Sequence, residues 1–464
     1  MDFFRFLMSD VLSEPAVLVG LIALIGLIAQ KKPVTECIKG TVKTIMGFVI
    51  LGAGAGLVVS SLGDFANIFQ HAFGIQGVVP NNEAIVSVAQ KSFGKEMAMI
   101  MFFAMVINIM IARFTPWKFI FLTGHHTLFM SMMVAVILAT AGMTGITLIA
   151  VGSLVVGVAM VFFPAIAHPY MKKVTGSDDV AIGHFSTLSY VLAGFIGSKF
   201  GNKEHSTEDM NVPKSLLFLR DTPVAISFTM SIIFLVTCLF AGADAVKELS
   251  GGKNWFMFSI MQSITFAAGV YIILQGVRMV IAEIVPAFKG ISDKLVPNAR
   301  PALDCPVVFP YAPNAVLVGF LSSFAAGLIG MFTLYLLNMI VIIPGVVPHF
   351  FVGAAAGVFG NATGGRRGAI LGAFAQGLLI TFLPVFLLPV LGDIGFANTT
   401  FSDADFGALG ILLGIIVRYY FDDINILQDF RNVEDINSSY FLHFSFFQSG
   451  LHPINRKRSE KYVA

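Results

Sequence analysis

The sequence predicts an all-α polytopic membrane protein with about eleven transmembrane helices, a fold class inferred from composition and hydrophobic patterning. Of the 464 residues, 56% are hydrophobic and only 12% are charged, whereas soluble domains contain about 45–50% apolar and about 25% charged residues. Apolar runs of about 20 residues, long enough for a helix to cross about 30 Å of hydrocarbon, recur along the whole chain. Because so few charges cannot cover a water-soluble surface, most of the chain is expected to face lipid.

The apolar runs and the basic residues between them predict the sidedness of the chain. The first run ends in Lys31-Lys32 rather than in a small-residue cleavage site, so it is expected to be a retained helix, not a signal peptide. With the N-terminus outside, the basic pairs at 31–32, 172–173 and 366–367 and the C-terminus lie in the cytoplasm, as the positive-inside rule requires. The expected spans are 16–30, 39–62, 96–112, 118–142, 145–168, 221–242, 254–284, 313–336, 337–362, 369–395 and 404–420.

Short matches about 220 residues apart predict an internal repeat. The range Gly47–Gly56 is followed by Val79-Pro80-Asn81, and Gly269–Gly276 is followed by Val296-Pro297-Asn298 in the same way. An odd number of spans separates the paired segments, so the two halves are expected to be inverted relative to each other. Inverted repeats with hydrophobic segments broken by Gly or Pro are typical of carriers that hold a solute near the middle of the membrane.

The repeat implies a domain organisation. One transmembrane permease domain is expected over residues 1–420, with its halves at about 16–170 and 221–420. A polar segment at about 171–220 separates the halves and is interpreted as cytoplasmic or re-entrant. Residues 421–464 lack clear periodicity and are expected to form a cytoplasmic tail.

Several function classes are disfavoured. The net charge is only +2, and no basic stripe is interleaved with aromatic residues, so nucleic acid is not an expected partner. Cys37, Cys238 and Cys305 lie far apart without CxxC spacing, which argues against a disulfide framework and a structural zinc site. Neither a Walker A sequence nor an HExxH pair is present, so no ATP motor and no zincin-type protease is indicated. No cofactor and no metal are expected.

Ionisable side chains within apolar segments are the candidate site residues, because each costs several kcal/mol in a bilayer unless it faces a cavity or a partner. His125 and His126 follow Gly124, where the backbone can break, and a neutral imidazole both donates and accepts hydrogen bonds. His184 follows Gly183 and is interpreted as the turn of a re-entrant hairpin. The alternatives are an interhelical hydrogen bond for His125 and a solvated loop for His184.

Asp304 lies between Pro301 and Pro306, which prevent a continuous helix, so it is expected on irregular backbone that lines protein or a wet cavity. Such an aspartate can act as a general base toward a solute hydroxyl, or it can hydrogen-bond the solute. Asn82 and Glu83 follow Pro80, at the position in the first half that corresponds to Asp304 in the second half. Their alternative interpretation is a capped helix start in an external loop.

Several segments make the chain similar to the ascorbate-specific IIC component of the bacterial phosphotransferase system. The resemblance extends from about residue 16 to residue 420 and is most specific at 275–320. The motifs that carry it are Leu122-Thr123-Gly124-His125, Ile182-Gly183-His184, the run from Gln275 through Ala287–Ser292 to Asp304-Cys305, Tyr311–Val316 and Ile343-Pro344-Gly345.

The resemblance implies a homodimeric permease of the bacterial cytoplasmic membrane, with a dimerisation part and a mobile core that moves the solute like an elevator. It also implies that the imported ascorbate is phosphorylated by a phosphocysteine on a separate IIB protein, which is recharged through IIA. In this family His125, His184 and Asp304 match positions that contact the substrate, and Asp304 matches the favoured base.

The chain departs from the family pattern at the expected site. It has Phe129 and Phe185 where the family has glutamines, and Asn82-Glu83 where the family has a Thr-Tyr pair. Aromatic rings in place of amides remove hydrogen bonds worth about 0.5–1.5 kcal/mol each and offer stacking surface instead, so Phe185 is a further pocket-lining candidate. A related sugar acid or polyol stays open as the solute. So do a proton- or ion-coupled secondary carrier and, less favoured, a membrane metalloenzyme.

Overall fold

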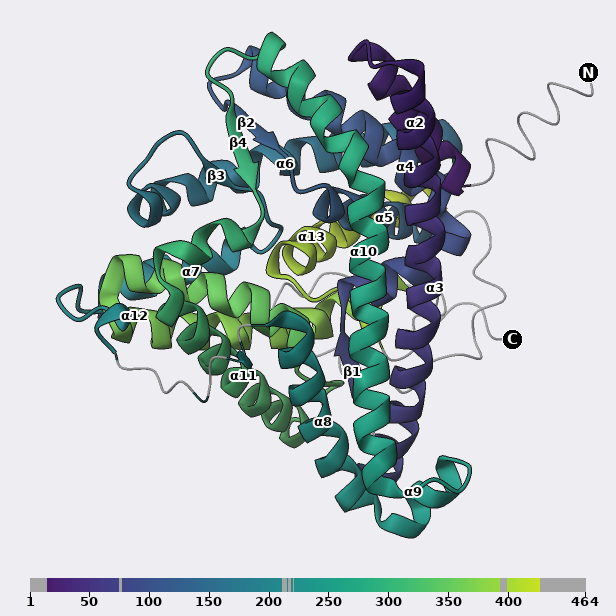
Figure 1. The fold of residues 1–464 in the computed structure, drawn as a ribbon, viewed down its shortest axis with the longest axis vertical. Helices are drawn as coiled ribbons and strands as arrows, with labels where there is room; N and C mark the ends of the chain where they lie inside the picture. The colour runs from purple at the N-terminus through teal and green to yellow at the C-terminus, as the bar shows by residue number, and fades with distance from the viewer. Residues whose placement is uncertain are drawn as a thin grey trace, which may run out of the picture. The chain divides into compact units, whose positions relative to one another are not determined.

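The computed structural model describes residues 15–74, 77–210, 215, 218–219, 221–392 and 399–425 (Figure 1). Within this part of the chain, seven helices are long and apolar enough to cross a membrane: α3, α4, α6, α8, α10, α11 and α12. The chain is therefore an all-α, multi-pass membrane protein, as its composition predicts. The helices are α2 Pro15–Ala29, α3 Val34–Phe73, α4 Asn82–Phe114, α5 Gly124–Thr140, α6 Gly145–Thr175, α7 Thr187–Phe200, α8 Thr222–Ala241, α9 Ala243–Leu249, α10 Trp255–Leu295, α11 Pro313–Leu336, α12 Val346–Leu391 and α13 Ala404–Asn425, with 3₁₀ turns η2 Thr207–Asp209 and η4 Cys305–Tyr311.

The expected spans differ from the helices mainly at their ends. The expected span 96–112 is only the second part of α4, because Asn81 caps this helix much earlier by accepting a hydrogen bond from the Ala84 N–H (2.7 Å). The expected spans 337–362 and 369–395 overlap α12 for most of their lengths, and this helix is interrupted between them at Gly364 and Gly365. Gly365 has a φ of 59°, a conformation that favours glycine. The total of eleven crossings stays a prediction.

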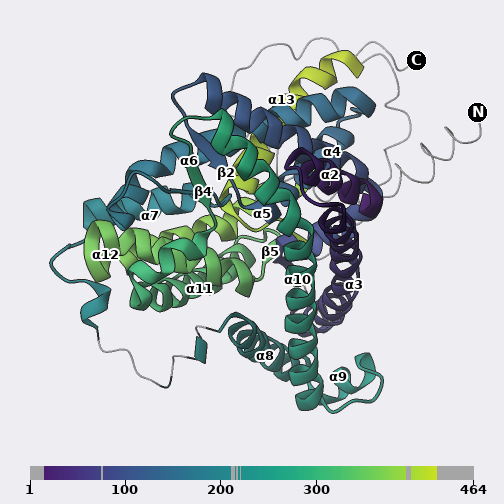
Figure 2. The same ribbon diagram turned by 45° about the horizontal axis from the view of Figure 1, so that its top comes forward.

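Glycines allow α3 and α10 to pack closely along their lengths (Figures 1 and 2). A Cβ atom on Gly54 would lie 2.8 Å from the backbone nitrogen of Ile273, and one on Gly47 would lie 2.7 Å from the carbonyl oxygen of Gly276. Small residues at such contacts let helix backbones approach in a bilayer. α12 packs in the same glycine-dependent way against α11 and α7 (Figure 2).

Two small parallel sheets interrupt the helical architecture. The first has the order β5-β1-β6 and the second the order β2-β4-β3. The central strand of each sheet comes from one half of the chain, and its two flanking strands come from the other half. The strands are β1 Gly77–Pro80, β2 Phe119–Phe121, β3 Ala181–Ile182, β4 Arg300–Leu303, β5 Val341–Ile342 and β6 Thr399–Thr400.

The compact unit that ends at Gly414 contains all of these elements except the last turns of α13. Of the second unit, 415–464, only the last turns of α13 to Asn425 belong to the described part of the chain. The expected cytoplasmic tail 421–464 therefore lies almost entirely outside the described residues.

Candidate functional site

The carboxyl edge of the second sheet gathers three of the candidate site residues predicted from the sequence. His125 follows β2, His184 follows β3 and Asp304 follows β4, and all three strands are parallel. Parallel strands end at the same edge of a sheet, so residues far apart in the sequence meet there. Gly183 is required for this approach, because a Cβ at that position would lie 2.5 Å from the carbonyl oxygen of Ala302 on β4.

Asp304 is held by two hydrogen bonds to one of its oxygens. Its Oδ1 accepts from the Cys305 N–H at the start of η4 (2.7 Å) and lies 2.8 Å from Nδ1 of His184. Its Oδ2 lies 3.5 Å from Nε2 of His125. The Asp304 side chain is 36% exposed, whereas that of His184 is 5% exposed. One carboxylate oxygen is thus fixed by the protein while the group as a whole stays accessible.

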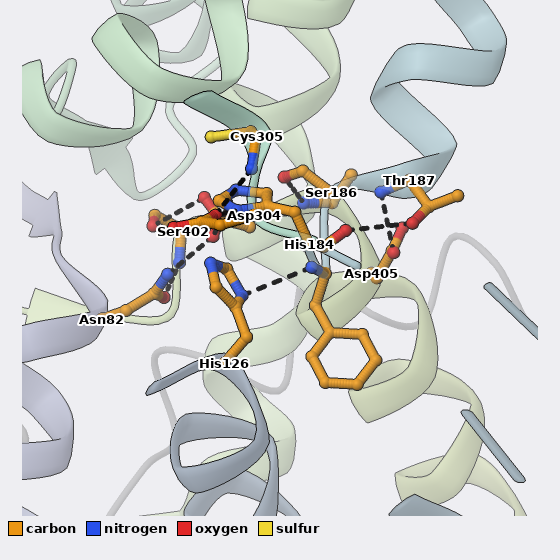
Figure 3. A network of polar contacts seen from close by, with 12 residues as sticks. Asn82, His126, His184, Ser186, Thr187, Asp304, Cys305, Ser402 and Asp405 are labelled. Carbon is orange, nitrogen blue, oxygen red and sulfur yellow. Dashed lines mark hydrogen bonds and ion pairs between the residues drawn. The ribbon is translucent and has the colours of Figure 1, made fainter. Parts of the chain in front are cut away.

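The first sheet contributes a second set of polar groups (Figure 3). Asn82 follows β1, and its Nδ2 donates to Oδ2 of Asp403, which follows β6 (2.8 Å). The Ser402 N–H donates to Oδ1 of Asn82 (2.9 Å), which fixes the orientation of the amide. Oδ2 of Asp403 lies 3.8 Å from Nε2 of His184. His184 therefore lies between Asp304, at the end of the second sheet, and Asp403, at the end of the first.

Glu83 is buried in the first turn of α4, beside Asn82. Its carboxylate interacts with a backbone N–H of its own residue and electrostatically with Asp403 and His184. The alternative interpretation of Asn82 and Glu83 is a capped helix start. A helix does begin here, but the residue that caps it is Asn81. Asn82 thus takes part in the network directly, and Glu83 lies next to it.

His126 and Phe185 are buried behind this network. Nδ1 of His126 accepts from the Phe185 N–H (3.3 Å), and its ring lies 3.8 Å from that of His184, centroid to centroid. The Phe185 ring is fully buried and stacks on Phe121. Phe129 is also buried, and its ring meets that of His125 in a T-shaped contact (5.8 Å between centroids). Both phenylalanines pack in an aromatic cluster, and the backbone of Phe185 supplies the contact to His126.

The starts of α7 and α13 hold each other beside the site. The Asp405 carboxylate accepts from the N–H groups of Thr187 (2.8 Å) and Leu188 (2.9 Å), at the N-terminus of α7. The Ala404 N–H donates to Oγ of Ser186 in return (3.2 Å). An anion at a helix N-terminus is favoured by the orphan N–H groups and the helix dipole. This reciprocal capping fixes the loop that carries His184.

Sequence reasoning missed Ser402, Asp403 and Asp405. These residues lie just before or inside the last expected span, where no proline or isolated histidine singles them out. The repeat offset of about 220 residues could have identified them, because β6 occupies the same position in the first sheet as β3 occupies in the second. Applying that offset to His184 would have pointed to the segment around Asp403.

Three overlapping groups within the described residues bring possible metal-ligand atoms within 4.8 Å of one another, among them His126, His184 and Asp403. The hydrogen bonds restrict this chemistry. Nδ1 of His126 already accepts from the Phe185 N–H, so a neutral ring carries its proton on Nε2. Nδ1 of His184 is engaged by Asp304. The donors and acceptors therefore suit the hydroxyl groups of a polar solute better than a metal ion.

The opposite edge of the second sheet is held by Asp178. Its carboxylate lies 2.7 Å from Nε2 of His168, 3.0 Å from Nζ of Lys172 and 2.6 Å from Nη2 of Arg300, the first residue of β4. The hydrogen bond with His168 and then those with Lys172 and Arg300 hold the pKa of Asp178 well below its usual range. This cluster joins α6, the start of β4 and the loop that precedes β3. It lies at the end of the sheet opposite to His184 and Asp304.

Comparison with known proteins identifies relatives of the chain. The family model of the sugar-specific permease component of the phosphotransferase system, EIIC-GAT, matches residues 10–405. The ascorbate-specific phosphotransferase-system EIIC component of Mycoplasma pneumoniae is 28% identical over 426 residues. The match covers 79% of this chain and 64% of that relative, so this chain spans just under two thirds of the relative's length.

Proposed function

Because the chain belongs to the family of sugar-specific permease components of the phosphotransferase system, we propose that it imports ascorbate or a closely related sugar acid across the bacterial cytoplasmic membrane. The solute is phosphorylated as it arrives, by a phosphocysteine on a IIB protein that IIA recharges. The name of the relative from Mycoplasma pneumoniae supports ascorbate as the solute. The residue differences at 82–83, 129 and 185 are the reason to include related sugar acids.

The geometry of Asp304 carries this proposal. Its Oδ1 is fixed by His184 and the Cys305 N–H, while its Oδ2 faces His125 on the more accessible side. When a solute hydroxyl attacks phosphorus, the new O–P bond forms, the cysteine S–P bond breaks, and the hydroxyl proton passes to Asp304. A positioned base of this kind contributes about 10²–10⁴-fold in rate. His125, His184 and Asn82 line the solute site, with His125 on the side of the accessible Oδ2 of Asp304, and Glu83, His126 and Phe185 complete the surroundings.

The two sheets support an inverted repeat with halves at about 16–170 and 221–420. Each sheet combines one central strand with two flanking strands from the other part of the chain, at matching positions about 220 residues apart. Of these strands, β3 comes from the segment 171–220 between the halves. In this proposal the solute is held where the repeats meet, and a mobile core moves it past a dimerisation part in a homodimer.

The basic residues support a cytoplasmic location for the edge of the second sheet that Asp178 holds. Lys118, Lys172 and Arg300 lie at this edge, and Lys118 donates to the carbonyl oxygens of Ala112 and Arg113 at the end of α4. The beginning of the segment 171–220, at Lys172 and Asp178, then faces the cytoplasm, where IIA and IIB act, with the N-terminus outside and the C-terminus inside.

The proposal is tested by uptake of labelled ascorbate into vesicles that contain the protein, with and without IIA, IIB and phosphoenolpyruvate. Accumulation of the phosphorylated solute only with the full relay is the expected result. Uptake that needs a proton gradient but no relay would instead identify a proton-coupled secondary carrier. If ascorbate gives no signal with the full relay, the same assay with other sugar acids and pentitols identifies the solute.

A further inference from the structure

His184 lies between two carboxylates that come from different sheets. Its Nδ1 is 2.8 Å from Oδ1 of Asp304, and its Nε2 is 3.8 Å from Oδ2 of Asp403. Nε2 is buried and has no hydrogen-bond partner. Two lone pairs facing each other in a buried site repel. The contact between Nε2 of His184 and Oδ2 of Asp403 is therefore favourable only if one of these two atoms is protonated.

The hydrogen bonds of Asp403 identify which group carries that proton. Its Oδ2 accepts from Nδ2 of Asn82, whose amide orientation is set by the Ser402 N–H. Its Oδ1 accepts from the hydroxyl of Ser402 (3.3 Å). Both oxygens therefore act as acceptors, as in an ionised carboxylate. The proton then belongs on Nε2 of His184.

Other titratable groups, both acidic and basic, also face His184. Asp405 and Glu83 interact with it electrostatically, His125 and His126 lie on the α5 side, and Tyr190 lies 5.9 Å away between ring centroids. Cys305 completes the shell next to Asp304. The two histidines oppose a positive charge on His184, and the four surrounding carboxylates favour it.

We propose that Asp403 is a positioning residue that acts through His184. The imidazolium ring of His184 donates to Asp304 on one side and faces Asp403 on the other, which keeps Asp304 ionised and aims its Oδ2 at the solute. Because Asp403 follows β6 and Asp304 follows β4, this chain of three groups also links the two sheets. The inference rests on the proposed function for its catalytic meaning, since Asp304 is the base of that reaction.

The first test is the pH profile of relay-driven solute uptake by Asp403→Asn. Turnover at neutral pH should fall at least about tenfold, with equilibrium solute binding within a few-fold of wild type. The alkaline limb should move to lower pH by about one unit, because an opposite charge at this distance favours the charged imidazole to that extent. Asp179→Asn is the matched control, since Asp179 is an exposed loop residue bonded to Ser177, and its profile should not move.

A double variant separates this role from a general structural one. If Asp403 acts only through His184 and Asp304, then Asp304→Asn combined with Asp403→Asn should lose no more turnover than Asp304→Asn alone. Losses that multiply, or an unmoved alkaline limb in Asp403→Asn, would overturn the proposal. If Asp403→Asn does not fold, Asp403→Ser removes the same charge and should give the same shift.

A second measurement needs no solute. Nitrogen NMR of purified protein with labelled histidines, with His184 assigned from a His184→Gln variant, should find both ring nitrogens of His184 protonated at neutral pH in wild type. Only one should be protonated in Asp403→Asn. A neutral His184 in wild type refutes the inference whatever the transported solute is. If His184 is charged but the protein shows no relay-driven uptake, the proposed function is refuted and the inference about Asp403 and His184 is not.

Discussion

Replacing Asp304 by asparagine removes the proposed base and leaves the local structure intact. The asparagine Oδ1 can still accept from the Cys305 N–H and from Nδ1 of His184, the two bonds that hold Asp304 in place. Its amide nitrogen occupies the position of Oδ2, which faces His125, and cannot accept a proton. Loss of a general base costs about 10²–10⁴-fold in rate, or about 3–6 kcal/mol at about 1.4 kcal/mol for each factor of ten.

The assay is phosphorylation-coupled uptake by vesicles with IIA, IIB and phosphoenolpyruvate, together with equilibrium solute binding to the purified variant. Turnover should fall by at least about a hundredfold, while solute affinity changes by no more than about tenfold, the equivalent of one lost hydrogen bond. Asp64→Asn is a matched control, because Asp64 accepts a hydrogen bond from Gln262 between α3 and α10 and its amide can do the same. Near-normal turnover of Asp304→Asn would refute the assignment of the base.

Further substitutions test binding, packing and the pH response. His125→Ala and His184→Ala should each weaken equilibrium solute binding by about 1–2 kcal/mol, and unchanged affinity in both would place the binding site elsewhere. Gly54→Val should lower the melting temperature by the equivalent of about 1–3 kcal/mol, because its Cβ would meet the Ile273 backbone at 2.8 Å; Gly56→Val, with open space around it, is the control and should be milder. The lowered pKa of Asp178 stabilises the fold above its ordinary pKa of about 4, and this contribution is lost as the pH falls through the lowered value. Melting temperatures of Asp178→Asn and wild type should therefore differ more at pH 6 than at pH 3, and an equal difference at both would contradict this linkage.

The sequence alone determined the class of the protein and part of its site. Hydrophobic composition and span length follow from the chemistry of the bilayer and need no tertiary information, which is why the membrane class is confirmed. His125, His184 and Asp304 also stood out locally, since a histidine after glycine or an aspartate between prolines is costly in an apolar segment. The structure brings these three residues together, and their roles in solute binding stay predictions.

Only the tertiary structure decided how the site is assembled. Strands of two to four residues are too short to show an alternating pattern of apolar and polar residues, so the two sheets could not be predicted from the sequence. The repeat offset points to the segment around Asp403, but its contact with Asn82 (2.8 Å between Oδ2 and Nδ2) comes from the pairing of β6 with β1. The structure also packs the Phe185 ring against Phe121 and Phe406, and sequence alone could not predict this because both rings are distant in the sequence. Local chemistry thus identified which side chains are costly in the membrane, and long-range strand pairing determined which of them meet.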